Sequence, residues 1–77
     1  MNKVRRQTLS DILSQIEEAK SSLEEVLSEE EEYRDNIPEN MQSSERYEKA
    51  EQACSDLEEA ISCIEDVVSY IESAIDQ

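Results

Sequence analysis

Residues 47–75 read YEKAEQACSDLEEAISCIEDVVSYIESAI and give the strongest evidence for the fold. One series of apolar residues in this stretch alternates three and four positions apart: Tyr47, Ala50, Cys54, Leu57, Ile61, Ile64, Val68, Ile71 and Ile75. This spacing predicts a long α-helix with a coiled-coil-like seam. A second series lies beside the seam and repeats every seven residues: Ala53, Ala60, Val67 and Ala74. The apolar stripe is therefore wide enough to contact more than one neighbouring helix.

The first half of the chain has the same three-and-four spacing, in Leu9, Ile12, Leu13, Ile16, Ala19, Leu23, Val26 and Leu27. It predicts an amphipathic helix over about residues 8–34. Thr8 with Asp11 resembles a capping box and marks the start, although Val4 could extend the stripe and move the start earlier. The acidic run 29–32 lies near the negative end of this helix, so we expect its last turns to fray.

Between the two helices, residues 35–44 read DNIPENMQSS. Pro38 forces the preceding Ile37 out of the helical region, which predicts a bend over residues 35–43. Asn36 with Glu39 is placed to cap a single turn near Pro38, and Ser43 or Ser44 is placed to cap a second helix over about residues 44–76. The sequence therefore predicts one all-α domain, residues 1–77, folded as an antiparallel two-helix hairpin.

A bend centred near residue 40 sets the register of this hairpin. Apolar residues then face each other along its length: Leu9 and Ile71, Ile16 and Ile64, Leu23 and Leu57, Leu27 and Ala53. Tyr33 is expected to stack on Tyr47 beside the bend. At the other end, the basic residues Lys3, Arg5 and Arg6 are expected to form exposed ion pairs with Glu72 and Asp76, each contributing about 0 to 1 kcal/mol.

A two-helix hairpin covers only one stripe on each helix, so several apolar residues stay in water. Burying a Leu or Ile side chain contributes about 1.5 to 3 kcal/mol, and an isolated hairpin without this burial is marginal. We therefore predict a homodimer that forms a four-helix bundle, with an interface built largely from the second helices. Its candidate residues are Leu13, Ile61, Val67, Val68 and Ile75.

The chain is strongly acidic, with 21 Asp and Glu against 7 Lys and Arg and a net charge of −14. This charge repels nucleic acid and anionic membranes and favours basic partners. No apolar run approaches the roughly 20 residues that span a bilayer, so we expect a soluble, cytoplasmic protein. Cys54 and Cys63 lie on opposite sides of one helix and cannot pair, and we expect both to be reduced thiols.

Catalytic chemistry is not expected. The chain has no His and no Gly, so it lacks the partner that activates a Ser or Cys nucleophile and the loop that cradles phosphate. Its carboxylates lie outside the apolar stripe, unlike the inward-pointing ligands of metal sites in helical bundles. We therefore expect a protein that is not an enzyme and has no metal or other cofactor.

The bend sequence NIPENMQSSERYEKAE and the acidic helix that follows it resemble a group of small uncharacterised acidic helical proteins encoded by phages and mobile elements of Gram-positive bacteria. The resemblance covers residues 33 to about 59. In that group the bend commonly reads IPENLQGSERYEKAE, so Met41 and Ser43 stand here where the common pattern has Leu and Gly. The resemblance implies an origin and an accessory role, and it names no site.

Two functions remain open from the sequence. The first is a small interaction or structural protein of a phage or mobile element that binds another protein through the bend or through Tyr70, with Ile37, Met41 and Tyr70 as candidate contact residues. The second is an acidic decoy that imitates the phosphates of nucleic acid and occupies a basic host or phage protein, such as a host DNA-binding or defence protein.

Overall fold

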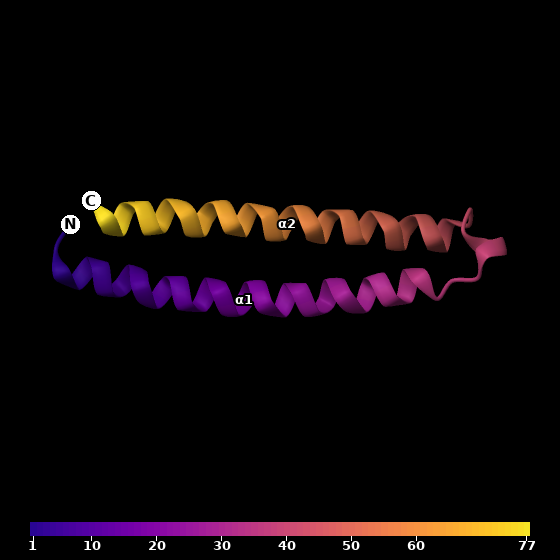
Figure 1. Cartoon of the computed structure of the whole chain (residues 1–77), viewed down its shortest axis with the longest axis horizontal. Coiled ribbons are helices and arrows are strands. Elements are labelled where there is room, and N and C mark those ends of the chain that lie inside the picture. The colour runs from indigo at the N-terminus through magenta and orange to yellow at the C-terminus, as the bar shows by residue number, and fades with distance from the viewer.

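The computed structural model describes residues 1–77 as an all-α hairpin. Two long helices, α1 (Lys3–Asp35) and α2 (Glu45–Asp76), run antiparallel and side by side, and a short 3-10 turn, η1 (Glu39–Met41), lies in the bend between them (Figure 1). The Cα atoms span 59 × 15 × 12 Å. Both termini lie at the end of this rod opposite the bend (Figure 1). The predicted two-helix hairpin is confirmed.

The first helix begins five residues earlier than its predicted start at Thr8. Asn2 is the N-cap, and its side-chain oxygen accepts a hydrogen bond of 2.8 Å from the backbone N–H of Arg5. The Thr8 hydroxyl instead donates to the carbonyl oxygen of Val4 at 3.0 Å, an interaction typical of a residue inside a helix. The capping-box interpretation of Thr8 is wrong, because Asn2, two residues before Val4, supplies a cap and the helix can start there.

The bend lies where it was predicted, between the end of α1 and the start of α2, and one capping residue differs from the prediction. Ile37 has only 2% of its surface exposed and is buried under the bend. Asn36 ends α1, where its backbone N–H donates to carbonyl oxygens of the last turn, so it does not cap η1 as expected. Ser44 caps α2, and its hydroxyl accepts a 3.3 Å hydrogen bond from the N–H of Tyr47. No residue has a positive φ angle, so the bend needs no glycine at Ser43.

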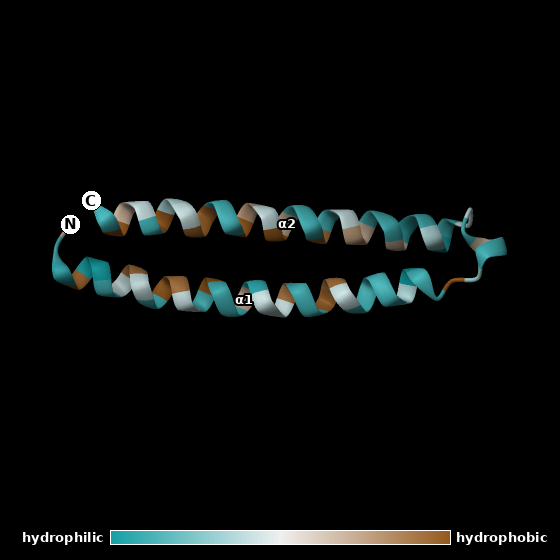
Figure 2. Cartoon of the chain, in the orientation of Figure 1, coloured by the Kyte–Doolittle hydropathy of each residue, from teal (hydrophilic) through white to brown (hydrophobic).

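The core is a thin seam between the two helices. Apolar segments of each helix face the other along most of the rod (Figure 2). Only four of the 77 residues are fully buried, which are Ile37, Ala50, Cys54 and Ile61. Most other seam residues are half-buried: Leu9, Leu13, Ile16, Leu23 and Leu27 on α1, and Leu57, Ile64, Val68, Ile71 and Ile75 on α2. A single hairpin therefore leaves its own core partly open to solvent.

Contacts at both ends agree with the predicted register. Arg6 contacts Ile75, and Tyr33 contacts Arg46, each one residue away from the partner that a bend at residue 40 predicts. In the middle of the rod, the Lys20 ammonium reaches Glu65, five residues beyond its predicted partner, with an N–O distance of 3.7 Å. Long flexible side chains allow this longer reach.

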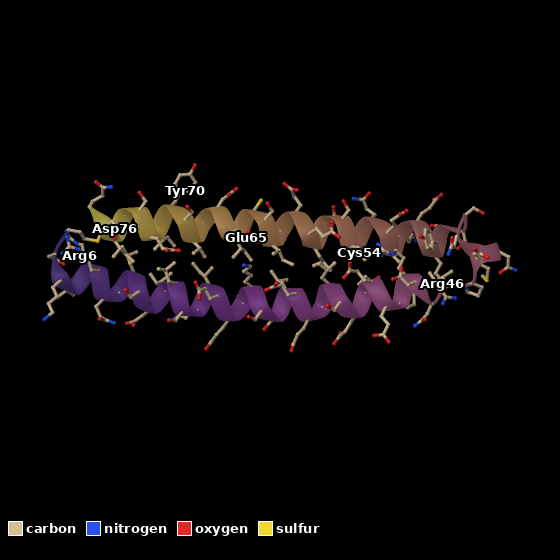
Figure 3. The ribbon with its side chains drawn as sticks, in the orientation of Figure 1. Arg6, Arg46, Cys54, Glu65, Tyr70 and Asp76 are labelled. Carbon is tan, nitrogen blue, oxygen red and sulfur yellow. The ribbon has the colours of Figure 1, made fainter.

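The basic residues of the first turns do not form the expected ion pairs with Glu72 and Asp76. Arg6 Nε instead donates to the backbone carbonyl oxygen of Ile75 at 3.1 Å, at the end of the rod where Asp76 also lies (Figure 3). The last turn of α2 contains no basic residue of its own. Arg6 therefore supplies, from the other helix, the positive charge and the donor that the C-terminal carbonyls of a helix favour.

Candidate interaction surfaces

The candidate contact residues in and near the bend differ in accessibility. Ile37 is buried, so the structure removes it from the candidate contact surface. The reason is local: the bend turns its side chain inward, where it closes the end of the seam. Met41, in η1, is exposed, as a contact residue must be. The expected stack of Tyr33 on Tyr47 is replaced by a contact between Tyr33 and Arg46.

Most of the residues predicted for a dimer interface belong to the seam within one hairpin. Ile61 is buried, and Leu13, Val68 and Ile75 are half-buried. Ile61, Val68 and Ile75 follow Cys54 at seven-residue intervals, so they share the column that faces α1. Of the five predicted residues, only Val67 is exposed, with 44% of its surface accessible. The residues predicted for an interface built largely from the second helices therefore lie mostly in the seam within one hairpin.

A different set of residues, all exposed except the half-buried Ala53, Ala60 and Ala74, forms one continuous stripe on each helix. Residues that alternate four and three positions apart are neighbours along a helix surface. On α1 the stripe contains Thr8, Ile12, Gln15, Ala19, Ser22, Val26, Glu29 and Tyr33, and on α2 it contains Lys49, Ala53, Asp56, Ala60, Cys63, Val67, Tyr70 and Ala74. These two stripes contain five of the eight large apolar residues that are exposed, namely Ile12, Val26, Tyr33, Val67 and Tyr70.

Both stripes lie on the same side of the hairpin. Within the α2 stripe, Ala53, Ala60, Val67 and Ala74 form the row next to the seam. Arg46 is seven residues before Ala53 and so extends this row toward the bend. Its Nε donates to the Tyr33 hydroxyl at 2.8 Å, and its guanidinium lies 5.3 Å from the centre of the Tyr33 ring. Tyr33 ends the α1 stripe, so this hydrogen bond and cation–π contact join the two stripes at the bend. We call the surface formed by the two stripes the apolar side.

Acidic residues are nearly absent from the apolar side. Of the 21 Asp and Glu in the chain, only Glu29 and Asp56 lie within its stripes. Lys49 lies there too, and Arg46 adjoins it. The apolar side is therefore close to neutral in a molecule whose net charge is −14.

The opposite edge of the seam is lined with carboxylates, which we call the acidic side. Glutamates recur there every seven residues, as Glu17, Glu24 and Glu31 on α1 and as Glu51, Glu58, Glu65 and Glu72 on α2. A hollow between the helices is lined by Glu17, Glu24 and Glu65 together with Lys20, which shows that the two glutamate columns meet on this edge. Lys20 pairs with Glu65, and it is the only basic residue in that hollow.

Tyr70 is the most exposed large apolar side chain, with 79% of its surface accessible. It projects from α2 away from α1 (Figure 3). Cys63 and Val67 precede it at seven and three residues, and all three are exposed. The predicted contact residue Tyr70 thus lies at the outer edge of the apolar side, next to Cys63 and Val67, and is not an isolated aromatic.

The two thiols differ in environment. Cys54 is 1% exposed, and its burial raises the pKa of the thiol above the ordinary value of 9.0, so that the neutral form is favoured. Cys63 is exposed on the apolar side. Both cysteines are free.

Sequence reasoning identified only part of these surfaces. It recognised the seven-residue series from Ala53 to Ala74 on α2. The matching series Ile12, Ala19, Val26 and Tyr33 on α1 was merged with the seam, and the glutamate columns were not separated from the other acids. The seam, the outer apolar series and the glutamate series each repeat every seven residues. Following each of these repeats separately along the sequence distinguishes the three surfaces.

No group of three or more His, Cys, Asp or Glu side chains is arranged to hold a metal ion. Neither helix combines the length and the apolar character that crossing a bilayer requires. Comparisons with protein-family models, with curated proteins and with solved structures found no match to this chain.

Proposed function

We propose that this chain is a small, non-enzymatic interaction protein of phage or mobile-element origin that acts in the cytoplasm and binds another protein through its apolar side. One observation carries the proposal: five of the eight exposed large apolar residues are gathered on the one side that is nearly free of acid. Contiguous exposed apolar surface rimmed by polar residues is typical of protein-binding sites.

The chemistry of the apolar side supports a protein partner. Tyrosine is enriched among the residues that dominate binding energy, and Tyr70 and Tyr33 lie at opposite ends of the side. Between them, small residues such as Ala19 and Ala60 allow another backbone to approach closely. A helix or helical pair with its own apolar stripe fits such a surface.

The test compares three baits in pull-downs from host lysate that also contains untagged copies of this chain. The baits are the tagged wild-type protein, Val67→Glu and Val4→Glu. Val67 lies on the apolar side, whereas Val4 is 74% exposed and lies outside both stripes. We expect a protein that the wild-type and Val4→Glu baits retain and that the Val67→Glu bait loses. Identical recovery by all three baits would contradict the proposal.

A second candidate function is an acidic decoy that occupies a basic protein, and the acidic side favours it. Regular carboxylate columns on two antiparallel helices that lie side by side resemble the charge rows of a nucleic acid backbone. We expect a decoy to bind basic proteins that elute steeply between low and moderate salt. Changing Glu17, Glu24 and Glu65 to Gln together should weaken such binding, whereas Val67→Glu should not.

A further inference from the structure

We infer that the partner of the apolar side is a second copy of this chain, packed face to face so that α1 of each copy lies against α2 of the other and both bends are at the same end. This inference rests on the proposed function, since it names the occupant of the same surface. It also moves the dimer interface from the seam residues of α2 to the outer stripes of both helices.

The heptad pattern of both helices is that of a four-helix bundle. In a two-stranded coiled coil, each heptad has apolar residues at two positions. In a four-helix bundle, each heptad has an apolar residue at a third position next to these two. Here both helices have this third column, which is Ile12, Ala19, Val26 and Tyr33 on α1 and Ala53, Ala60, Val67 and Ala74 on α2. Because both columns lie on one side, a second hairpin can cover them together.

The charge distribution selects a second copy over a basic partner. Two chains of net charge −14 repel each other, and the repulsion is weakest when the surfaces in contact lack acid. The apolar side meets this condition, and face-to-face packing directs the glutamate columns of both copies outward into solvent. A basic partner is attracted to the opposite, acidic side and gains little from the neutral one.

Side-chain size selects the arrangement. The column of each stripe that adjoins the seam differs in size: three of its four residues on α1 are large (Ile12, Val26 and Tyr33, with Ala19), whereas on α2 only Val67 is large, beside Ala53, Ala60 and Ala74. Large residues pack best against small ones across an interface. A twofold axis along the rod places α1 on the partner's α2 with the bends together, whereas a perpendicular axis places α1 on α1 and α2 on α2.

The available area is sufficient. A rectangle with the two largest Cα extents, 59 and 15 Å, covers about 900 Å². A stable interface buries roughly 800 Å² on each partner. Burial of this side also covers the half-buried seam, which in one hairpin contains only four fully buried residues.

Sedimentation equilibrium and thermal melting of the purified wild-type chain test the inference. We expect a dimer at micromolar concentration and a melting temperature that rises with protein concentration. Val26→Glu and Val67→Glu should each weaken dimerisation by at least about 100-fold, because each buries an unpaired charge. Val4→Glu is the matched control and should leave the dimer unchanged. A folded monomer whose melting temperature is independent of concentration would overturn the inference, whether or not any variant folds.

The arrangement is tested by distance. A spin label attached at Asn40→Cys reports the separation of the two bends. The chain also carries Cys63→Ser, and Cys54 is not labelled because it is buried. Bends at the same end should give a distance below about 30 Å, whereas bends at opposite ends of the rod should give a distance near its 59 Å length. The longer distance would overturn the packing of α1 on α2.

Failure of this inference is distinguishable from failure of the proposed function. A monomeric wild-type chain that still captures a different protein, with loss in the Val67→Glu bait only, would leave the proposed function standing and exclude the second copy. Equal capture by the Val67→Glu and Val4→Glu baits would remove both.

Discussion

At the scale of single residues, Cys54 shows how the seam controls side-chain chemistry. Its pKa is influenced by Arg34, Glu30 and Glu31 on α1 and by Glu58 on α2. Burial still dominates and raises the pKa of the thiol, since a thiolate is poorly solvated there. Cys63, two and a half turns later, is exposed to solvent.

We predict that Cys63 reacts with iodoacetamide at least about 100-fold faster than Cys54 in the folded protein, at a dilution where the apolar side is not covered by a second copy. Mass spectrometry of the alkylated peptides over time measures the two rates. Denaturant should abolish the difference, because it exposes both thiols equally. Similar rates in native buffer would show that the seam opens readily around Cys54.

Stability should fall as pH rises above about 9. Below the ordinary thiol pKa of 9.0, Cys54 is neutral in both the folded and the unfolded chain and contributes no pH dependence. Between that value and the raised pKa of the folded state, only the unfolded chain loses the proton, which favours unfolding. Denaturant melts at pH 8 and pH 10 should show this loss, and Cys54→Ala should reduce it relative to the wild type.

Ile61 and Glu58 test the assignment of the seam. Ile61→Asp places an unpaired carboxylate among buried residues and should cost about 3 kcal/mol or more, enough to unfold a thin hairpin. Glu58→Gln changes an exposed residue and should shift stability by less than about 0.5 kcal/mol. Circular dichroism melts measure both, and equal shifts would contradict the assignment of these two faces.

At the scale of helices, the ends are set by caps and by contacts from the other helix. Asn2 caps α1, Ser44 caps α2, and Arg6 crosses from α1 to the last carbonyls of α2. The acidic run 29–32 does not end α1, which continues to Asp35. Arg34 in the last turn supplies a favourable positive charge there, and its hydrogen bond to Asp35 raises its pKa further.

The corrected start of α1 gives a direct test. Asn2→Ala removes the side-chain acceptor of the cap and should cost about 1 kcal/mol. Thr8→Ala removes only a hydroxyl that is bonded inside the helix and should change stability by less than about 0.5 kcal/mol. Urea melts of the two variants measure the difference. A larger loss for Thr8→Ala would restore the later start.

At the scale of the whole molecule, the rod separates apolar contact from charge. The apolar side is nearly neutral, and most carboxylates lie elsewhere on the surface, so self-repulsion is spread along 59 Å. A net charge of −14 on a chain this small still favours expansion.

We therefore predict that the melting temperature rises when salt is added at pH 7, and when pH is lowered from 7 toward 5. Salt screens the repulsion between carboxylates, and partial protonation removes some of the charge. Melts at constant protein concentration in 10 mM and 500 mM NaCl measure the first effect. A melting temperature that decreased under both treatments would show that specific carboxylate interactions outweigh the repulsion.

The hairpin follows from local features of the sequence. Apolar spacing over two long segments, one proline and the nearby cap formers were sufficient for the two helices, the bend and an approximate register, because these depend on periodicity and on local backbone preferences. The start of α1 was wrong by five residues because two polar residues, Asn2 and Thr8, were both able to cap.

Which apolar residues remain exposed depends on how the two helices pack. Ile37, Ile61, Val67 and Tyr70 are all apolar in the sequence, yet the first two are buried and the last two are exposed. Periodicity gives the angle of a side chain about its own helix but not the direction in which the partner helix lies. Once α2 is placed against α1, that direction is known, and the apolar and acidic sides follow from it.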